Sequence, residues 1–438
     1  MKKILALVLA LCMVFALAAC GQAAAPAAQE AAPAQEAAPA AEEAAPAEEA
    51  AAPAVKVGLI FLHDENSTYD ANFLNAAKEV FEANGMVEGT DFIIKTQIPE
   101  DQTCEDTALD LVDQGCNVIF SDSYGHQSYM LAAAKECPDV DFISATGDMA
   151  TAEKLANYHN AFADIYMGRF LVGVAAGLKL NEMIESGKIT ADQAKMGYVG
   201  AYTYAEVISG YTSFYLGAKS VCPSVTMDVT FTGSWYDETA EKAAAQSLID
   251  GGCVLLSQHA DSYGAPTACA EAGVPDVSYN LDTSDAGPDT YLASSRINWA
   301  PYFQYILDCK ASGTAIDEDW CGTLEGGSVE VISISEANAA PGTLEKVEEV
   351  KAGLLDGSVK VFDTANFTVT VDAENGINAN ATVDENGVLT GYMANAIGGD
   401  FDPDTEAIVD GVFAESEFRS APYFDVQIDG ITLLDTAF

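Results

Sequence analysis

The stretch Leu111-Val-Asp-Gln-Gly-Cys-Asn-Val-Ile-Phe-Ser121, followed directly by Asp122-Ser-Tyr-Gly125, decides the fold class of this chain. A close copy occurs as Leu248-Ile-Asp-Gly-Gly-Cys-Val-Leu-Leu-Ser257, and Asp261-Ser-Tyr-Gly264 follows it after a short gap. Unless chance has matched common strand residues, the copies predict two similar α/β lobes. Each lobe then presents a Ser-Tyr-Gly loop at the carboxyl end of an equivalent strand, where open α/β sheets bind ligands. Two lobes that face each other across such loops form a cleft that can close.

Short apolar runs alternate with segments of helical spacing around these copies. The runs lie at 57–61, 92–94, 118–120 and 142–143, and the alternation restarts at 195–200. Buried strands that alternate with helices are typical of a parallel sheet covered on both faces. We therefore expect an α/β fold with two doubly wound parallel-sheet lobes joined by a hinge.

The chain after about Gly322 has a different character. Residues 343–355 predict one amphipathic helix, and strand and turn signals follow at 359–362, 366–371, 384–389 and 425–430. We assign residues 55–162 plus about 286–322 to the first lobe, and 163–285 plus about 323–373 to the second. Residues 374–438 then form a β-rich C-terminal extension packed on the second lobe, with no recognisable chemistry.

The first twenty residues predict export. Lys2 and Lys3 precede the apolar run Ile4–Leu17, which is too short to span a bilayer. Small residues then precede Cys20, an arrangement similar to a bacterial lipobox, although an ordinary secretory signal is the alternative. The similarity implies a signal peptide at 1–19, cleavage before Cys20 and lipid on its sulfur.

Residues 20–54 contain little besides Ala, Pro, Glu and Gln. Such a segment cannot bury a core and predicts a semi-rigid tether. We expect an extracytoplasmic protein that is lipid-anchored to the bacterial cell membrane through Cys20.

A formal net charge of −48 limits the partners. Nucleic acid is excluded, because phosphate binding needs clustered Lys and Arg. An anionic membrane surface does not attract such a chain, so we expect membrane contact through the lipid anchor only. Hydrophobic residues make up 49% of the chain, which indicates a normal core under a solvated acidic surface.

Cysteine usage favours neither a zinc site nor a defined disulfide framework. Of ten cysteines, Cys12 leaves with the leader. Cys309 and Cys321 are the first choice for a disulfide, because they lie close together around a Gly-containing loop. Cys116 and Cys253 lie in apolar strand-like runs and are expected to be buried thiols. No CxxC motif or Cys/His cluster occurs, so we expect no metal.

The common catalytic motifs are missing from the sequence. There is no P-loop, no G-x-G-x-x-G after the first strand, no G-x-S-x-G and no H-E-x-x-H. We expect a binding protein without a cofactor rather than an enzyme. An extracellular hydrolase with a triad dispersed along the sequence is the alternative from another class.

Aromatic and polar residues gather in the loops predicted after the strands. A flat ligand between rings gains stacking beyond burial, and a few fixed polar groups read its edge. For any single ring, core packing is the alternative. The loops supply these candidate ligand contacts: Thr68, Tyr69, Ser123, Tyr124, Tyr202, Glu206, Trp235, His259, Asp261 and Asp282.

Several short motifs occur in a characteristic order between about Val55 and Ile306, and more weakly to Gly357. They are Ser123-Tyr-Gly125, Ala145-Thr-Gly147, Met167-Gly-Arg-Phe-Leu-Val-Gly-Val-Ala-Ala-Gly177, Ala205-Glu-Val-Ile-Ser-Gly210, Gly233-Ser-Trp235, Gln258-His-Ala-Asp261 and Asn298-Trp-Ala-Pro-Tyr302. Together they resemble the BMP family (basic membrane protein, purine nucleoside receptor-like) of ABC-transporter substrate-binding lipoproteins.

The resemblance implies a type I periplasmic-binding-protein fold and purine nucleosides or related flat heterocycles as ligands. It implies that Trp235 stacks on the base and that Tyr69 covers the other face. Ser123 and Glu206 match loop positions that can read polar edges.

Two positions depart from the family pattern. Nucleoside-binding members carry an acid where Tyr279-Asn280 stands and a lysine near Asn298, and those groups hold the ribose hydroxyls. Neutral Asn280 and Asn298 weaken charge-assisted hydrogen bonding, although Asp282 can partly substitute. These departures therefore favour a free nucleobase over a nucleoside as the ligand, and a flavin remains an alternative ligand. Asn280 and Trp299, from these motifs, join the candidate contacts.

The sequence thus predicts a lipid-anchored, monomeric receptor that captures a purine-type ligand, nucleobase or nucleoside. It would deliver that ligand to an ABC permease and its ATPase. A sensor lipoprotein for the same ligand class is the alternative, and permease and ATPase genes alongside would separate the two.

Overall fold

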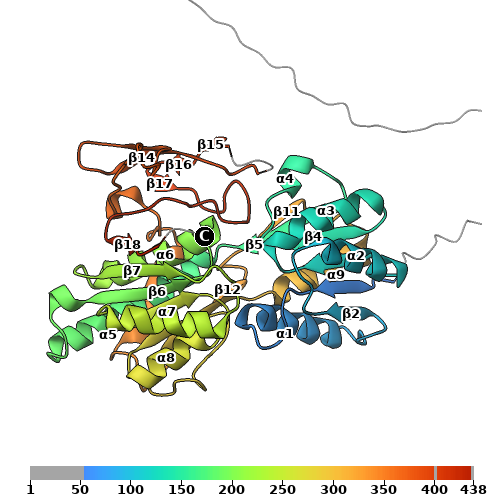
Figure 1. Cartoon of the computed structure of the whole chain (residues 1–438). Coiled ribbons are helices and arrows are strands. Elements are labelled where there is room, and N and C mark those ends of the chain that lie inside the picture. Colours follow the sequence, from blue (N-terminus) through green and yellow to red (C-terminus); the bar gives the residue numbers. More distant parts are fainter. Residues whose placement is uncertain (1–53, 399–401, 436–438) are drawn as a thin grey trace, which may run out of the picture. The chain divides into compact units, whose positions relative to one another are not determined.

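The computed structural model describes residues 54–398 and 402–435. The predicted signal peptide, Cys20 and all but the end of the predicted tether fall in residues 1–53, outside the described residues. Figure 1 shows two α/β lobes and, beside β7 and α6, the β-rich C-terminal extension.

The first lobe is built on a parallel sheet with the strand order β11-β5-β4-β3-β1-β2. Its strands are β1 (Val57–Ile60), β2 (Phe92–Lys95), β3 (Val118–Ser121), β4 (Asp141–Ala145), β5 (Tyr158–Ala163) and β11 (Asp319–Gly322). Its helices are α1 (Thr68–Ala83), α2 (Gln102–Asp113), α3 (Gln127–Glu136), α4 (Ala150–Glu153) and α9 (Ala300–Ser312), with a 3-10 turn η1 (Tyr124–His126).

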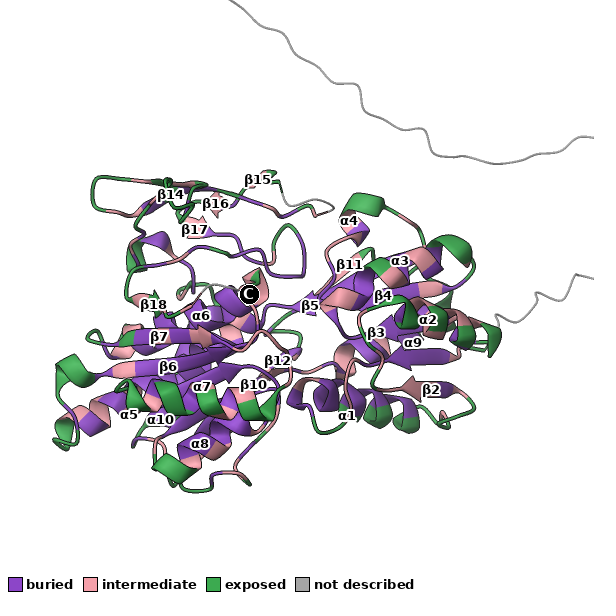
Figure 2. Ribbon diagram, viewed as in Figure 1, coloured by how far each residue is buried: buried purple, intermediate pink, exposed green. Residues whose placement is uncertain are grey.

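Both faces of this sheet are covered, as predicted. Side chains of successive strand residues point to opposite faces. Phe120 of β3 packs against Phe73 of α1, whereas Ile119 lies in a separate apolar cluster with Met130 of α3. Figure 2 shows the buried strands between helices whose outer faces are exposed.

The second lobe repeats the plan with the strand order β12-β10-β9-β8-β6-β7-β18. Its strands are β6 (Lys195–Gly200), β7 (Thr226–Phe231), β8 (Leu255–His259), β9 (Asp276–Tyr279), β10 (Tyr291–Ile297), β12 (Val329–Ile334) and β18 (Ile431–Leu433). Its helices are α5 (Ile165–Glu185), α6 (Ala205–Val221), α7 (Glu238–Asp250), α8 (Gly264–Ala272) and α10 (Thr343–Leu355), with a 3-10 turn η2 (Ala191–Gln193). Neighbouring strands are parallel, except that β12 is antiparallel to β10.

The two copies of the repeated stretch occupy equivalent places. β3 lies between β1 and β4, and β8 lies between β6 and β9. The strand order β4-β3-β1-β2 of the first lobe therefore matches β9-β8-β6-β7 of the second. The two-lobe α/β fold predicted from the copies is confirmed.

Two glycines let α5 and α6 touch backbone to backbone. A Cβ on Gly173 would lie 2.1 Å from the carbonyl oxygen of Phe214, and one on Gly217 would lie 2.1 Å from that of Phe170. Only glycine permits such an approach. This contact accounts for part of the glycine-rich Met167–Gly177 motif.

The chain crosses between the lobes at three places that lie side by side. The crossings are at Asp164, at Asn298 and at 323–328. The Asp164 N–H donates to the Gly322 carbonyl across 2.9 Å, and the Asn298 N–H donates to the Ser328 carbonyl across 2.8 Å. Hydrogen bonds thus tie the three crossings into one hinge.

One predicted lobe boundary needs correction. Residues 286–297 were assigned to the first lobe, but β10 pairs in parallel with β9 of the second sheet. The chain returns to the first lobe only at α9, which packs on α1. The boundary therefore lies near Asn298.

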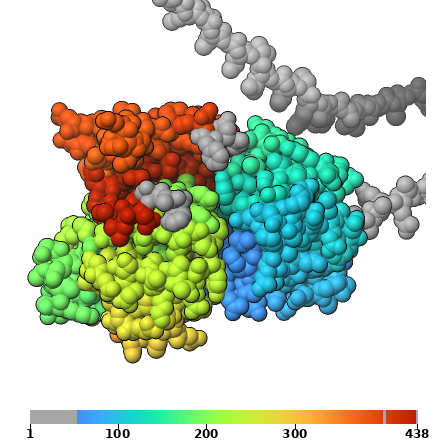
Figure 3. Space-filling view, viewed as in Figure 1, coloured from blue at the N-terminus to red at the C-terminus, as the bar shows by residue number. Residues whose placement is uncertain are grey.

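The C-terminal extension packs on the second lobe but also contacts the first. It begins before the predicted residue 374, because the Thr364 N–H donates to the Gly411 carbonyl and the Phe413 N–H donates to the Phe362 carbonyl. It comprises η3 (Thr364–Asn366), β13 (Ala381–Val383), β14 (Leu389–Ala394), β15 (Thr405–Glu406), β16 (Ile408–Val409) and β17 (Val412–Phe413), and it ends in β18. Stacking of Phe362 on Phe424, with ring centroids 4.2 Å apart, forms part of its core. Toward the first lobe, Ser420 donates to Asp319 through its N–H at 2.7 Å and through its Oγ at 2.5 Å. Figure 3 shows the extension against the second lobe with one edge near the first.

The predicted Cys309–Cys321 disulfide is wrong. Every cysteine among the described residues is a free thiol. Trp320 of β11 packs on Tyr302 of α9, with ring centroids 4.7 Å apart. Because strand side chains alternate, Cys321 points to the other face of the sheet, away from Cys309. Cys116 and Cys253 are buried thiols, as expected.

No helix within the described ranges has the length and apolar character needed to cross a membrane.

Candidate ligand-binding site

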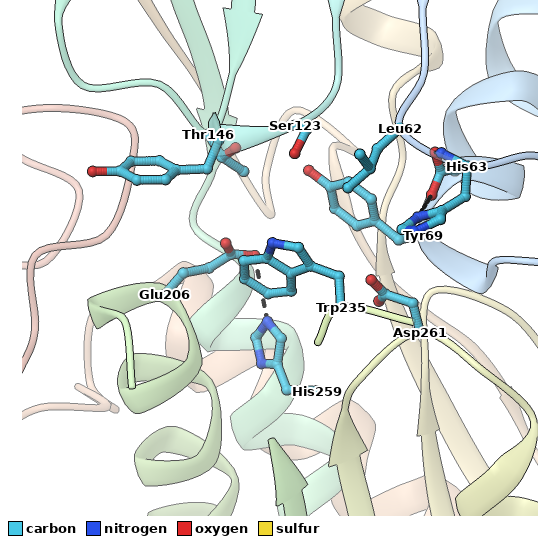
Figure 4. A pocket seen from close by; sticks show the side chains of 11 residues that line it. Leu62, His63, Tyr69, Ser123, Thr146, Glu206, Trp235, His259 and Asp261 are labelled. Atoms are coloured by element: carbon cyan, nitrogen blue, oxygen red, sulfur yellow. Dashed lines mark hydrogen bonds and ion pairs between the residues drawn. The ribbon is translucent and has the colours of Figure 1, made fainter. Parts of the chain in front are cut away.

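A cavity lies between the lobes, at the carboxyl ends of their parallel strands. Figure 4 shows that Leu62, Ser123 and Thr146 approach it from the first lobe, while Glu206, Trp235 and His259 approach from the second. The lining residues are Leu62, His63, Tyr69, Asp70, Ser123, Tyr124, Thr146, Glu206, Trp235, His259 and Asp261.

The cavity brings together many of the residues selected from the sequence. Those that line it are Tyr69, Ser123, Tyr124, Glu206, Trp235, His259 and Asp261. Sequence reasoning did not select Leu62, His63, Asp70 and Thr146. Two signals pointed to them: the polar loop after the first strand, and the Ala145-Thr-Gly147 motif.

Trp235 is held by a ring cluster behind it. Its indole meets Tyr202 edge-on, with centroids 5.1 Å apart, and Tyr202 stacks on Tyr204 at 5.2 Å. Tyr204 in turn contacts Tyr124 of the first lobe at 5.6 Å. Tyr202 was predicted as a ligand contact, but the structure places it behind Trp235 and outside the cavity lining.

Tyr69 is fixed opposite this cluster. Its ring packs edge-on against Phe73 at 4.9 Å, and its hydroxyl donates to the Asp122 carbonyl across 2.8 Å. Burial raises the pKa of the Tyr69 phenol, so the group remains protonated. The ring is therefore a rigid, uncharged wall of the cavity.

Glu206 and His259 form a polar pair on the floor of the cavity. Glu206 Oε1 lies 3.3 Å from Nε2 of His259, and the other ring nitrogen of His259 lies 3.3 Å from the Tyr198 hydroxyl. Burial lowers the pKa of His259, which keeps the ring neutral at pH 7. The ring thus orients the Glu206 carboxyl group toward the cavity.

Three buried aspartates lie in or beside the cavity: Asp70 and Asp261 line it, and Asp122 lies next to Asp70. The pKa of Asp70 is lowered, since hydrogen bonds from His63 and Ser67 outweigh the effect of burial. The pKa values of Asp122 and Asp261 are raised by burial and then by the charge of Asp70. The site therefore contains both carboxylate acceptors and carboxyl groups that favour their protonated form.

The lining residues set the charge preference of the site. Neither lysine nor arginine belongs to the described residues that line this cavity. The hydroxyl of Ser123 donates to Glu100 and that of Thr146 to the Ala145 carbonyl, both across 2.5 Å, so toward a ligand these oxygens accept. The arrangement suits a neutral, flat molecule with hydrogen-bond donors, and it disfavours an anion.

The lobes are in contact around the cavity. The Thr68 N–H donates to the Asp261 carbonyl across 2.8 Å, and the rings of His63 and Tyr236 lie 5.5 Å apart. Thr68 therefore contributes a backbone bridge rather than a side chain in the cavity.

The remaining predicted contacts lie elsewhere. Trp299 is buried and stacks on Phe73 at 4.3 Å, so it belongs to the core between α1 and the sheet. Asp282 accepts hydrogen bonds from Ser284 and Ser333. Asn280 is buried with a φ of 69°, outside the cavity lining.

The chain is similar to known substrate-binding proteins. The Bmp family model, described as "ABC transporter substrate-binding protein PnrA-like", matches residues 57–357. A purine-binding protein of Brucella abortus is 31% identical over 313 residues, which cover 70% of this chain and 83% of that protein. A putative ABC transporter glucose-binding protein of Haloferax volcanii is 29% identical over 251 residues, which cover 57% of this chain and 60% of that protein.

A solved ABC transporter solute-binding protein of Conexibacter woesei shares the fold. It superposes with a TM-score of 0.56 and 23% identity, over 70% of this chain and 98% of that one.

Proposed function

The chain belongs to the Bmp family of PnrA-like ABC transporter substrate-binding proteins, and on this premise we propose that its interlobe cavity captures a purine-type ligand. The base stacks on Trp235, and Tyr69 closes the other side. The observation that carries the proposal is that these two rings, one from each lobe, line one cavity. The name of the Brucella abortus relative supports the same ligand class.

The polar groups of the cavity match the edge of a purine. A purine offers exocyclic or ring N–H groups that donate and ring nitrogens that accept. Glu206 and the Ser123 hydroxyl oxygen accept from the donors, and a protonated Asp261 donates to the ring nitrogens. A fixed set of such groups gives specificity, while stacking contributes about 0.5–1.5 kcal/mol per ring beyond burial.

Delivery follows from closure of the lobes. A ligand that contacts both lobes binds the closed form better and shifts the population toward it. We propose that this closed, monomeric receptor presents the ligand to an ABC permease and its ATPase. The lipid on Cys20 holds the receptor at the membrane, and residues 20–54 act as the tether.

Small molecules that co-purify with the protein identify the ligand. Protein purified from its native host is denatured, and the released small molecules are analysed by mass spectrometry. We expect a purine or a related flat heterocycle, and titration with that compound should quench tryptophan fluorescence. Trp235→Phe identifies the responding ring, since Trp299 and Trp320 lie outside the cavity lining.

A sugar receptor is the second candidate, because the Haloferax volcanii relative is named a putative glucose-binding protein. Binding of glucose, with no binding of any purine, would replace the purine proposal.

Anchoring and transport are tested in cells. Cys20→Ala should release the protein into the soluble extracytoplasmic fraction, whereas continued membrane association would contradict the lipid anchor. Deleting the permease gene should abolish ligand uptake. Unchanged uptake, together with a ligand-dependent transcriptional response, would favour the sensor alternative.

A further inference from the structure

A second, larger cavity adjoins the aromatic cavity. Tyr124, Thr146 and Glu206 line both cavities, so the two spaces meet at these side chains. The second cavity has a third wall in addition to the two lobes. This wall comes from the C-terminal extension, through Asn395, Arg419 and the segment 421–425.

The extension lies beyond the residues that the family model matches, which end at 357. The third wall is therefore an addition of this chain to the two-lobe plan. Any ligand group that enters the second cavity meets side chains that the family pattern does not supply.

Arg419 is built into this wall. Its side chain is buried, with 8% of the residue's surface exposed. Its Nε donates to the Ala421 carbonyl and its Nη2 to the Pro422 carbonyl, both across 3.0 Å. Its Nη1 lies 3.6 Å from Asp148 of the first lobe. The guanidinium is thus held in place at the boundary between extension and first lobe.

Acid exceeds base around the second cavity. Carboxyl groups of Asp148, Glu206 and Asp425 face one guanidinium, that of Arg419, among the described lining residues. A phosphate would be repelled by this excess. Sugar and polyol hydroxyls donate to carboxylates and accept from guanidinium and amide N–H groups, so they match the lining.

In this chain, the two positions that hold ribose in the family pattern, Asn280 and Asn298, do not contact either cavity. Asn298 donates through Nδ2 to the Gly327 carbonyl across 3.1 Å and is part of the hinge. Neither Asn280 nor Asn298 lines either cavity. A hydroxyl-bearing substituent must therefore find its partners elsewhere, and the second cavity offers them.

We propose that the C-terminal extension builds a second subsite beside the aromatic cavity, and that this subsite binds an uncharged, hydroxyl-rich substituent carried by a flat heterocycle. The ligand is then larger than a free nucleobase, and its phosphorylated forms are excluded. The proposal rests on the proposed function, because it assumes that the heterocycle occupies the aromatic cavity.

Calorimetric titration with matched compounds tests the subsite on the mature chain lacking only its leader and lipid. The probes are adenine, adenosine and AMP; hypoxanthine, inosine and IMP; and lumichrome, riboflavin and FMN. In at least one series we expect the hydroxyl-bearing member to bind about tenfold tighter than the bare heterocycle, and the phosphorylated member to bind more weakly than either.

Substitutions that fill the second cavity with a larger side chain, here called plugs, distinguish the contributions of the two subsites to binding. Ala205 and Ala421 line the second cavity but not the first. Ala205→Leu fills it from the second lobe and Ala421→Leu from the extension. Each should reduce the affinity for the hydroxyl-bearing compound to that of the bare heterocycle, while the bare heterocycle binds as before. Ala365→Leu, an exposed residue of the extension outside both cavities, is the matched control and should change neither.

Two different outcomes overturn different claims. If bare heterocycles bind but the hydroxyl-bearing partner binds no tighter in any series, or if both plugs weaken the two compounds equally, the second subsite is refuted and the proposed function stands. If no compound of the three series binds, the proposed ligand class fails and the subsite fails with it. Unchanged binding of the bare heterocycle also shows that a plugged variant is folded.

Discussion

The backbone N–H of Thr68, at the first residue of α1, donates to the carbonyl of Asp261 in the loop after β8. This bond of 2.8 Å joins the lobes directly beside the aromatic cavity. Asp261 also lies in the second copy of the Asp-Ser-Tyr-Gly sequence, so one of the paired loops carries an interlobe contact.

Thr68→Pro removes this bond and leaves α1 intact. Proline is favoured at the first position of a helix, and the N-cap Ser67, with ψ near 129°, already has the extended backbone that precedes proline. We expect a nearly unchanged melting temperature and an affinity for ligand lowered about fivefold, since one hydrogen bond contributes roughly 1 kcal/mol. Thr68→Ala retains the N–H and serves as the control. If both variants lose the same affinity for ligand, the backbone hydrogen bond between Thr68 and Asp261 plays no part in closure of the lobes.

Two tryptophans should behave oppositely when truncated. Trp235→Ala removes a ring of the cavity and should weaken ligand binding at least about tenfold with little change in the free energy of unfolding. Trp299→Ala leaves a hole against Phe73 in the core and should cost roughly 3–5 kcal/mol of that free energy. Denaturant unfolding and calorimetry measure both quantities. A Trp235→Ala protein with unchanged affinity would refute the stacking role.

The hinge residue Asp164 should make stability depend on pH. Burial raises the pKa of Asp164 to about 7. The folded-state pKa lies above the unfolded value of 3.8. The stabilising contribution of Asp164 to the free energy of unfolding is therefore complete below pH 3.8, and it is lost as the pH rises to about 7. The loss amounts to at most about 1.4 kcal/mol per pH unit between those values.

Asp164→Asn isolates this effect from the other carboxyl groups. The free energy of unfolding of the variant, minus that of the wild type, should rise between pH 5 and 7 and level off above about pH 8. A difference that is independent of pH would show that Asp164 is ionised in the folded protein throughout this range.

The described cysteines should be free thiols that need no reducing agent before they can be alkylated, and most of them should be shielded from reagents in the folded protein. Cys137 and Cys321 are partly exposed, and burial raises the pKa of Cys321 to about 12. Iodoacetamide at pH 8 should therefore modify the native protein slowly and at Cys137 first, and modify the other described cysteines only in denaturant. Peptide mass mapping gives the order. Cysteines that resist modification in denaturant until a reductant is added would reveal a disulfide.

Much of the fold followed from sequence because its signals are local. The repeated Gly-Cys strand with its Asp-Ser-Tyr-Gly loop placed β3 and β8 in equivalent positions, and the structure agrees. The assignment of β10 failed because an apolar strand carries no mark of the sheet it joins. Its partner β9 is fixed by where the chain crosses between lobes, which is a long-range property.

The candidate site was predictable where a side chain's direction follows from its loop. Trp235 and Tyr69 follow strand ends and face the cavity. Trp299 also follows a strand, but it directly precedes α9 and turns toward Phe73 in the core. The contribution of Arg419 could not be foreseen, because the return of the extension to the first lobe depends on packing between distant segments.

The three hydrogen-bonded crossings have a consequence for how a ligand leaves. Because hydrogen bonds join the three crossings, the segments bend together, and the lobes rotate relative to each other about a single axis. The extension is joined to the second lobe by the pairing of β18 with β7, and to Asp319 of the first lobe through Ser420. Rotation about this axis would move Tyr69 and Ser123 away from Trp235 and Glu206, and it would break the bond between Thr68 and Asp261.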